Sequence, residues 1–163
     1  MAKILLGFMG SGKTTVAKYL KGRGVDMDAL IEEKIGMTIS DFFAAKGEAA
    51  FRAIESETLE ELLKLEGDTV ISTGGGVVLS EKNRELLRQN RRNNVLLTTS
   101  FDVVYRRIQE DTHAQRPLFQ TKSKEEFQDL FQRLMALYQD LADLVIHTDN
   151  RTPEEIARLI TCM

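Results

Sequence analysis

Cysteine, proline and long apolar runs are all scarce in this chain of 163 residues. The single cysteine, Cys162, has no partner for an internal disulfide, so we expect a free thiol in a reducing compartment. No apolar run approaches the roughly 18 residues that a membrane span needs, and the apolar stretch at the N-terminus is too short for a signal peptide. With 2 prolines and 11 glycines, the composition also excludes collagen-like sequence. We therefore expect a cytoplasmic protein with no membrane partner.

An excess of basic residues is absent as well. Lysines and arginines number 22 against 25 aspartates and glutamates, which gives a net charge of −3. This balance argues against a nucleic-acid-binding protein with a broadly basic surface, so we predict no nucleic-acid partner. Apolar residues at 42% and charged residues at 29% are typical of a soluble globular protein. The length fits one domain over residues 1–163, and we expect a monomer.

Short apolar runs alternate with longer segments of helical periodicity. The runs predict strands over residues 3–8, 69–72, 95–97 and 144–147. The predicted helices are 14–21, 28–35, 38–46, 48–65, 80–89, a stretch from 100 or 102 through 108, 125–142 and 152–160. Strands separated by helices indicate a parallel sheet, so we predict an α/β fold of three layers with about five strands. Ligands in such folds bind at the C-terminal ends of the strands.

Residues 7–14 read Gly-Phe-Met-Gly-Ser-Gly-Lys-Thr and match the phosphate-loop pattern G-x-x-x-x-G-K-[ST], between a predicted strand and a predicted helix. Gly10 and Gly12 let the backbone turn several N–H groups toward one anion, and the start of the helix adds partial positive charge. Lys13 can reach the β- and γ-phosphates, and the Thr14 hydroxyl can ligate Mg²⁺. The motif therefore predicts binding of a nucleoside triphosphate, without indicating which reaction follows. The predicted nucleotide-binding residues are Gly10, Ser11, Gly12, Lys13, Thr14 and Thr15.

Four further segments, together with the phosphate loop, resemble the shikimate kinases in content and order. They are residues 26–28, residues 47–52 with Glu55, residues 73–76 and residues 116–118. The resemblance covers nearly the whole chain. It implies transfer of phosphate from ATP to the 3-hydroxyl of shikimate, with Mg²⁺, on the route to aromatic amino acids. It also implies a P-loop fold like that of nucleoside-monophosphate kinases, with a substrate-binding helical segment at about 28–66 and a lid at about 111–124.

The residue types in these segments suit that substrate. Arg52 offers a planar fork that can bind a carboxylate through two hydrogen bonds, and Glu55, one helical turn away, can hold it in place. Asp28 can accept hydrogen bonds from hydroxyl groups, and the resemblance implies that it positions or deprotonates the attacking hydroxyl. Asp26 lies on the opposite side of an extended dipeptide and is predicted to face the metal. The loop glycines let the backbone approach the ring and donate N–H groups; they are Gly74, Gly75 and Gly76.

The resemblance also points to residues near the nucleotide. Arg116 lies in the long polar loop and is the candidate for a mobile cation that closes over the transferred phosphate. Arg107 and Pro153 are expected on either side of the adenine, with Arg106 as the alternative to Arg107. Each of these residues also has a purely structural interpretation: Asp28 as a helix cap, Arg52 and Arg116 as solvent-exposed charges, and residues 74–76 as a plain turn. The ordered set of motifs favours the functional interpretation of these residues.

Two features depart from the family pattern. The family has a substrate-binding arginine four residues before a tyrosine that corresponds to Tyr138, but Leu134 occupies that position and the arginine, Arg133, comes one step earlier. One step on a helix turns a side chain by about 100°. Either the helix is adjusted locally or Arg52 carries more of the contact with the substrate carboxylate, and we keep Arg133 as a candidate substrate-binding residue. The crossover from residue 14 to residue 25 is also short, close to the minimum of about 10–12 residues, which leaves little room for a second strand.

Three functions therefore remain open from the sequence. The first is a shikimate kinase. The second is another small-molecule or nucleotide kinase of the same architecture. The third is an inactive ATP-binding regulatory module, which the short crossover and the displaced arginine keep open.

Overall fold

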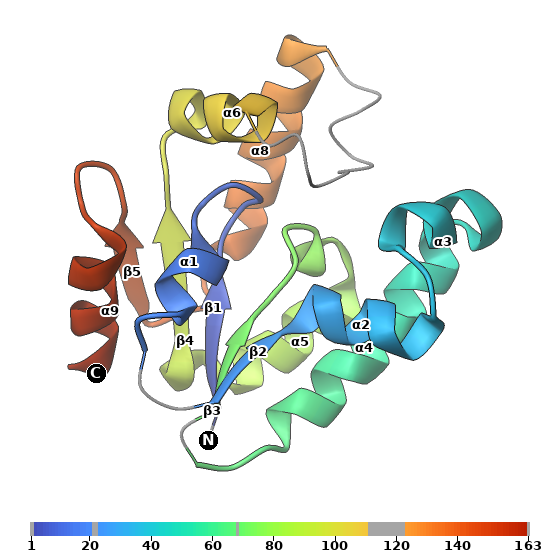
Figure 1. Ribbon diagram of the computed structural model, residues 1–163, viewed down its shortest axis with the longest axis horizontal. Coiled ribbons are helices and arrows are strands. Elements are labelled where there is room, and N and C mark those ends of the chain that lie inside the picture. Colours follow the sequence, from blue (N-terminus) through green and yellow to red (C-terminus); the bar gives the residue numbers. More distant parts are fainter. Residues whose placement is uncertain (1, 21–22, 68, 111–122, 163) are drawn as a thin grey trace.

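Five parallel strands, in the order β2-β3-β1-β4-β5, form the centre of the molecule (Figure 1). The computed structural model describes residues 2–20, 23–67, 69–110 and 123–162. Within them the strands are β1 (Lys3–Leu6), β2 (Arg23–Asp26), β3 (Thr69–Ser72), β4 (Asn94–Thr98) and β5 (Leu144–His147). All neighbouring strands pair in parallel, which confirms the predicted sheet.

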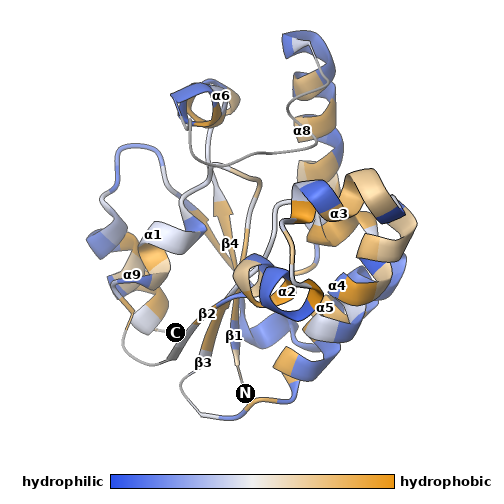
Figure 2. Cartoon of the chain, turned by 45° about the vertical axis from the view of Figure 1, so that its right-hand side comes forward, coloured by the Kyte–Doolittle hydropathy of each residue, from blue (hydrophilic) through white to orange (hydrophobic). Residues whose placement is uncertain are grey.

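Helices cover both faces of the sheet. On one face lie α1 (Lys13–Ala17) and α9 (Pro153–Thr161), and on the other lie α4 (Glu48–Leu63), α5 (Glu81–Gln89) and α8 (Lys124–Tyr138). Alternate strand residues supply the two cores: Leu5 packs with Ile156 of α9, while Ile4 and Leu6 belong to the larger core on the other side. Figure 2 shows the apolar strands between helices whose outer faces are polar. The three-layer α/β architecture is thus confirmed.

The remaining helices lie around the C-terminal end of the sheet. They are α2 (Met27–Ile35), α3 (Ile39–Lys46) and α6 (Phe101–Glu110), with single 3₁₀ turns at Val77–Leu79 and Arg91–Asn93. Side chains accept hydrogen bonds from backbone N–H groups at the starts of several helices, as at Thr38 before α3 and Ser80 before α5. Most predicted helices begin within two residues of these starts. Within the described ranges, no helix is long and apolar enough to cross a membrane.

Two helices are shorter than predicted. The segment expected to be helical to residue 142 ends at Tyr138, because Asp140 adopts a left-handed backbone conformation with φ of 68°. The segment expected over 14–21 forms only the five residues of α1, followed by turn hydrogen bonds as far as Leu20.

The short crossover accommodates a complete second strand, so the expectation that it leaves little strand is wrong. Each of the four residues of β2 has a partner on β3, ending with Asp26 beside Ser72. The room comes from α1, which has barely more than one turn. Asp26 consequently lies at the C-terminal end of a paired strand. The predicted lid at 111–124, with Arg116, falls almost entirely outside the described residues.

Candidate active site

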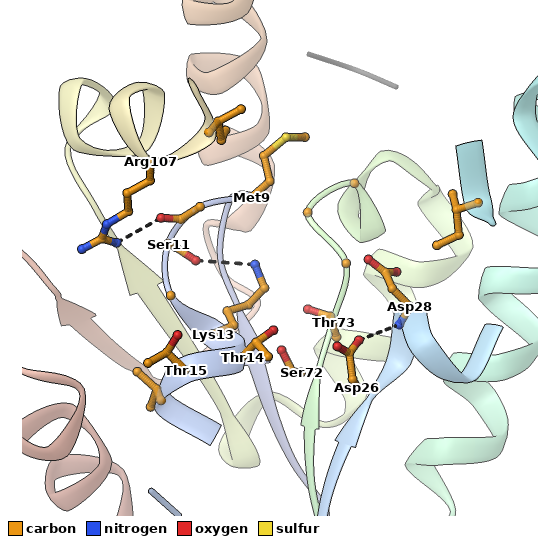
Figure 3. Close-up of a pocket in the computed structure, with 18 of the residues that line it drawn as sticks. Met9, Ser11, Lys13, Thr14, Thr15, Asp26, Asp28, Ser72, Thr73 and Arg107 are labelled. Atoms are coloured by element: carbon orange, nitrogen blue, oxygen red, sulfur yellow. Dashed lines mark hydrogen bonds between the residues drawn. The ribbon is translucent and has the colours of Figure 1, made fainter. Parts of the chain in front are cut away.

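The C-terminal ends of β1, β2 and β3 open into a cleft of about 1130 Å³ (Figure 3). Its walls come from the loop after β1, the start of α2, the N-terminal part of α4, the loop after β3 and residues of α6 and α9. The predicted site residues that it brings together are Gly10, Ser11, Gly12, Lys13, Thr14, Thr15, Asp26, Asp28, Arg52, Gly74, Gly75, Gly76, Arg107 and Pro153.

The phosphate loop wraps around the start of α1. Gly10 and Gly12 have φ of 81° and 94°, in the left-handed region that glycine enters without strain. The Lys13 ammonium lies inside the loop, where it donates hydrogen bonds to the carbonyl oxygens of Gly7 at 2.5 Å and Phe8 at 3.2 Å. Backbone N–H groups and one ammonium around a small concavity make a site for a phosphate chain.

Both aspartates of the segment 26–28 line the cleft, but not in the way predicted. The carboxylate of Asp26 caps α2 by accepting hydrogen bonds from the backbone N–H groups of Asp28 at 3.1 Å and Ala29 at 3.3 Å. The chain is helical from Met27 onward, so these residues do not form an extended dipeptide with opposed side chains. Asp28 instead lies in the first turn of α2, and its carboxylate faces the loop after β3 (Figure 3).

Each of the three loop glycines makes room for a different part of the site. A Cβ atom on Gly74 would lie 2.6 Å from Oδ1 of Asp28, one on Gly75 would lie 2.8 Å from the backbone nitrogen of Met9, and one on Gly76 would lie 2.8 Å from Nη2 of Arg52. Real Cβ atoms do not approach other atoms so closely. The sequence predicted glycines here so that the backbone could approach a substrate. The structure gives a second reason, because this backbone already packs against Asp28, Met9 and Arg52.

Arg52 is held by contacts on several sides. Its Nη1 donates hydrogen bonds to Oε1 of Glu55 at 2.9 Å and to the carbonyl oxygen of Gly76 at 3.0 Å. The guanidinium also lies near the rings of Phe51 and Phe43, at 5.2 Å and 5.9 Å from their centroids. The side chain is 14% exposed, so the cation is presented to the cleft in one restrained position.

Glu55 is a buried carboxyl. Burial raises its pKa above the ordinary value of 4.5, Arg52 opposes that rise, and the carboxylate of Asp28 adds to it. Two oppositely charged groups thus meet where water has little access, which strengthens their attraction. The predicted support of Arg52 by Glu55 is present as a hydrogen-bonded ion pair.

Two buried residues of this region, Asn83 and Tyr138, were given no role in the sequence analysis. The amide of Asn83 on α5 donates a hydrogen bond to Oε1 of Glu55 at 3.1 Å, and no sequence motif marks it. The hydroxyl of Tyr138 lies 2.8 Å from the carbonyl oxygen of Gly7 and 3.2 Å from that of Gly75, so it ties the two loops together. Burial raises the pKa of Tyr138 far above its ordinary value, which keeps this hydroxyl a proton donor.

Two arginines were predicted to lie at the site, Arg107 beside the nucleotide and Arg133 beside the substrate, and only Arg107 lines the cleft. Arg107 lines the cleft, with Nη1 donating to the carbonyl oxygen of Gly10 at 3.0 Å, and Pro153 lies on the same rim. Arg133, by contrast, is exposed on α8 and lines a separate shallow depression with Glu126 and Asp129. Leu134 is the residue buried at this point of the helix, because one residue turns the side chain by about 100°. The structure does not bring Arg133 to the cleft.

The donor set of the cleft fits a hard cation that is bound mainly by phosphate and water. Mg²⁺ prefers six oxygen ligands, and it usually takes only one or two from protein side chains beside nucleotide phosphates. The Thr14 hydroxyl and the Asp26 carboxylate both line the cleft and are of this type. In the described part of the chain, no cluster of three or more histidine, cysteine or carboxylate side chains could hold a metal ion by itself.

Comparison with known proteins points to one family. A family model described as "Shikimate kinase" matches residues 9–163. The shikimate kinase of Streptococcus thermophilus is 65% identical over 163 residues, which is 100% of each chain. The shikimate kinase of Streptococcus suis is 57% identical over 162 residues, 99% of each chain. A solved structure, a shikimate kinase from Acinetobacter baumannii in complex with shikimate, is 33% identical with a TM-score of 0.88, covering 98% of this chain and 90% of that one.

Proposed function

Because this chain belongs to the shikimate kinase family and is an ATP-dependent kinase of shikimate, we propose that its cleft divides the reaction between a nucleotide side and a substrate side. The observation that carries this division is that Lys13, Asp28 and Arg52 line one cleft while coming from three different elements. An alcohol held between Asp28 and the phosphate loop would meet the terminal phosphate there. The product would be shikimate 3-phosphate, with ADP.

On the nucleotide side, the loop from Gly10 to Thr15 binds the phosphates of ATP. Backbone N–H groups contact the phosphate oxygens, and Lys13 leaves the carbonyl oxygens of its own loop to stabilise charge on the transferred phosphoryl group. Arg107 and Pro153 border the space for the adenine, since both lie on the rim beyond the loop. The guanidinium of Arg107 is planar and can stack on a base.

On the substrate side, Arg52 binds the carboxylate of shikimate. Its Nη1 is engaged by Glu55 and Gly76, so the ring contacts and these hydrogen bonds fix the plane of the fork before substrate arrives. Asp28 accepts the proton of the 3-hydroxyl, or orients that hydroxyl for attack on the γ-phosphorus. The backbone of Gly74, Gly75 and Gly76 lies between these two side chains and can approach the ring.

Mg²⁺ is part of this proposal because the donor set fits it. Thr14 and Asp26 would hold the ion, and when bound it would neutralise charge on the phosphates. Asp26 has a second task, since it caps α2 and thereby fixes the position of Asp28. A role of Arg116 in closing the site stays a prediction, as do the monomeric state, the cytoplasmic location and the lack of a nucleic-acid partner.

A coupled assay for ADP release tests the proposal. We expect ADP release that depends on both shikimate and Mg²⁺, and none above background with a gluconate or a nucleoside monophosphate as acceptor. Asp28→Asn keeps the shape of the side chain but removes its charge, so kcat should fall by a factor of about 10²–10⁴ while the Kd for ATP is kept.

The matched control is Asp102→Asn, which changes an aspartate in the first turn of another helix, α6, outside the cleft lining. This variant should keep the wild-type rate. A near-normal kcat for Asp28→Asn would remove Asp28 from its proposed role, and ADP release with a nucleoside monophosphate but not with shikimate would contradict the substrate.

A further inference from the structure

A buried amide on α5 contacts Glu55, which holds Arg52, and the residue that follows Gly76, the other residue that holds Arg52. Asn83 is 0% exposed, and its Nδ2 donates hydrogen bonds to Oε1 of Glu55 at 3.1 Å and to the carbonyl oxygen of Val77 at 2.9 Å. Nη1 of Arg52 donates to the same oxygen of Glu55 and to the carbonyl oxygen of Gly76, the residue before Val77. One side chain therefore connects the carboxylate and the turn on which the arginine rests.

The orientation of this amide follows from its neighbours. The hydroxyl of Ser56 donates a hydrogen bond of 2.6 Å to Oδ1 of Asn83, so the NH₂ group must point the other way. That way lie two acceptors, the carboxylate of Glu55 and the carbonyl oxygen of Val77, which only an NH₂ group can satisfy. Ser56 is 5% exposed, so the whole chain from Ser56 through Asn83 to Glu55 is closed to water.

Charge gives this connection a functional consequence. Burial raises the pKa of Glu55, with Arg52 and Asn83 acting against the rise and the carboxylate of Asp28 adding to it. Burial raises the pKa of the Tyr138 hydroxyl most, and the nearby charge of Glu55 adds to that rise. A hydrogen bond from Asn83 favours the ionised form of Glu55, and only this form makes a full ion pair with Arg52.

We propose that Asn83 is a positioning residue for Arg52, acting through Glu55 and through the turn at Gly76 and Val77. The proposal rests on the role given above to Arg52 as the group that binds the substrate carboxylate. Without Asn83, Glu55 and the carbonyl oxygen of Val77 each lose a hydrogen-bond donor. The guanidinium of Arg52 can then move away from the position in which it binds the substrate carboxylate. The cost falls on shikimate binding, because the hydrogen bonds of Asn83, Glu55 and Arg52 join them to one another, to Glu48, to Ser56 and to the turn at Gly76 and Val77, and not to the phosphate loop.

The test compares steady-state kinetics of Asn83→Ser and Ser56→Ala with those of the wild type. Asn83→Ser should raise the KM for shikimate about tenfold, the loss expected for one hydrogen bond to a charged group. Ser56→Ala removes only the hydroxyl that orients the amide, so the rise should be smaller, about threefold. In both variants the KM for ATP and kcat should stay within about twofold of the wild type.

Asn90→Ser is the matched control. Asn90 is a second buried asparagine, 4% exposed, whose Nδ2 donates to the carbonyl oxygen of Ala2 at 3.2 Å and to Oδ1 of Asn94 at 2.8 Å, away from the cleft. Asn90→Ser should lower the melting temperature in the way that Asn83→Ser does, but leave the KM for shikimate unchanged. If Asn83→Ser does not yield folded protein, Ser56→Ala carries the comparison.

Three results would overturn the inference. They are an unchanged KM for shikimate in Asn83→Ser or, where that variant does not fold, in Ser56→Ala; an equal rise in Asn90→Ser; and an equal rise in the KM for ATP.

Arg52→Lys separates this inference from the proposed function. If Arg52→Lys leaves the KM for shikimate unchanged, the role of Arg52 itself fails and takes the inference with it. If that KM rises in Arg52→Lys but not in the Asn83 and Ser56 variants, only the inference about Asn83 fails.

Discussion

The nucleotide side of the cleft is built mainly from one continuous loop, whereas the substrate side is assembled from several elements of the fold. On the nucleotide side, the groups proposed to bind phosphate come from one loop of consecutive residues, whose shape depends on the left-handed conformations of Gly10 and Gly12. On the other side, Asp28 comes from α2, Arg52 from α4 and the loop glycines from the end of β3. The first half needs only the right local conformations. The second needs the whole fold to bring its parts together.

This difference in construction predicts how mutations affect each side of the cleft. A loop held by its own hydrogen bonds and by one helix should lose function when one key group is removed, but its neighbours should stay in place. The substrate side depends on contacts between elements, so small changes of volume or charge should disturb it. The two halves meet where the backbone of Gly75 touches Met9 and where the hydroxyl of Tyr138 faces Gly7 and Gly75.

On the nucleotide side, the largest effect should come from Lys13→Ala. Lys13 is the one lysine or arginine among residues 7–14 and is 7% exposed, so its removal takes away the cation that the loop itself holds beside the transferred phosphate. We expect kcat to fall about a thousandfold, the scale seen when one such stabilising group is lost. The Kd for shikimate, measured by calorimetry, should change less than twofold.

This variant tests the independence of the halves. Lys18→Ala, which removes an exposed lysine just after α1, is the control for loss of positive charge and should be active. A large loss of shikimate affinity in Lys13→Ala would show that the two sides are not built separately.

Gly76→Ala should produce a smaller effect than Lys13→Ala, on the substrate side alone. The new Cβ would lie 2.8 Å from Nη2 of Arg52, so the guanidinium must move. We expect the KM for shikimate to rise about tenfold or more, since a misplaced carboxylate contact costs at least the worth of one charge-assisted hydrogen bond. Gly24→Ala on β2 is the control, because its Cβ would meet nothing within 4 Å. Equal effects of the two substitutions would mean that Gly76 matters only as a flexible residue.

The same contrast explains what the sequence could predict. The phosphate loop is a contiguous motif whose geometry is local, so its residues, its strand and its helix follow from the pattern. The sheet and most of the helices follow from periodicity and capping residues in the same way. Asp28, Arg52 and the three glycines were found through their place in an ordered set of segments, and the structure brings all of them to the cleft.

The errors of the sequence analysis arise from the rest of the fold. The extended dipeptide at residues 26–28 was wrong because Asp26 caps a helix that starts one residue later, which period-two reasoning cannot see. Asn83 carries no motif, since its importance lies in contacts with α4 that are 27 and 28 residues distant in sequence. Arg133 shows the converse: an arginine one step from the family position is turned to solvent while Leu134 fills the core.

The smallest expected effect concerns the pH dependence of stability. It tests the substrate side through a single buried carboxyl, that of Glu55. Burial raises the pKa of Glu55 above its ordinary value of 4.5, so the folded state favours the neutral form more than the unfolded state does. The stability that this group contributes is full below the ordinary pKa and is lost as the pH rises through the raised one. Glu55→Gln removes that loss.

The melting temperature of Glu55→Gln relative to the wild type should therefore rise between pH 4.5 and pH 8, whatever the constant offset between the two proteins. A difference of 1 kcal/mol moves the melting temperature of a domain of this size by about 2–4 °C, which calorimetry resolves. Glu57→Gln, two residues away on the exposed side of α4, should show no such trend. At neutral pH the Glu55 variant should also have a raised KM for shikimate, because Arg52 loses its ion pair. If the difference in melting temperature between Glu55→Gln and the wild type stays constant over this pH range, the pKa of Glu55 is not raised. Burial would then not disfavour the charge of Glu55 on the substrate side.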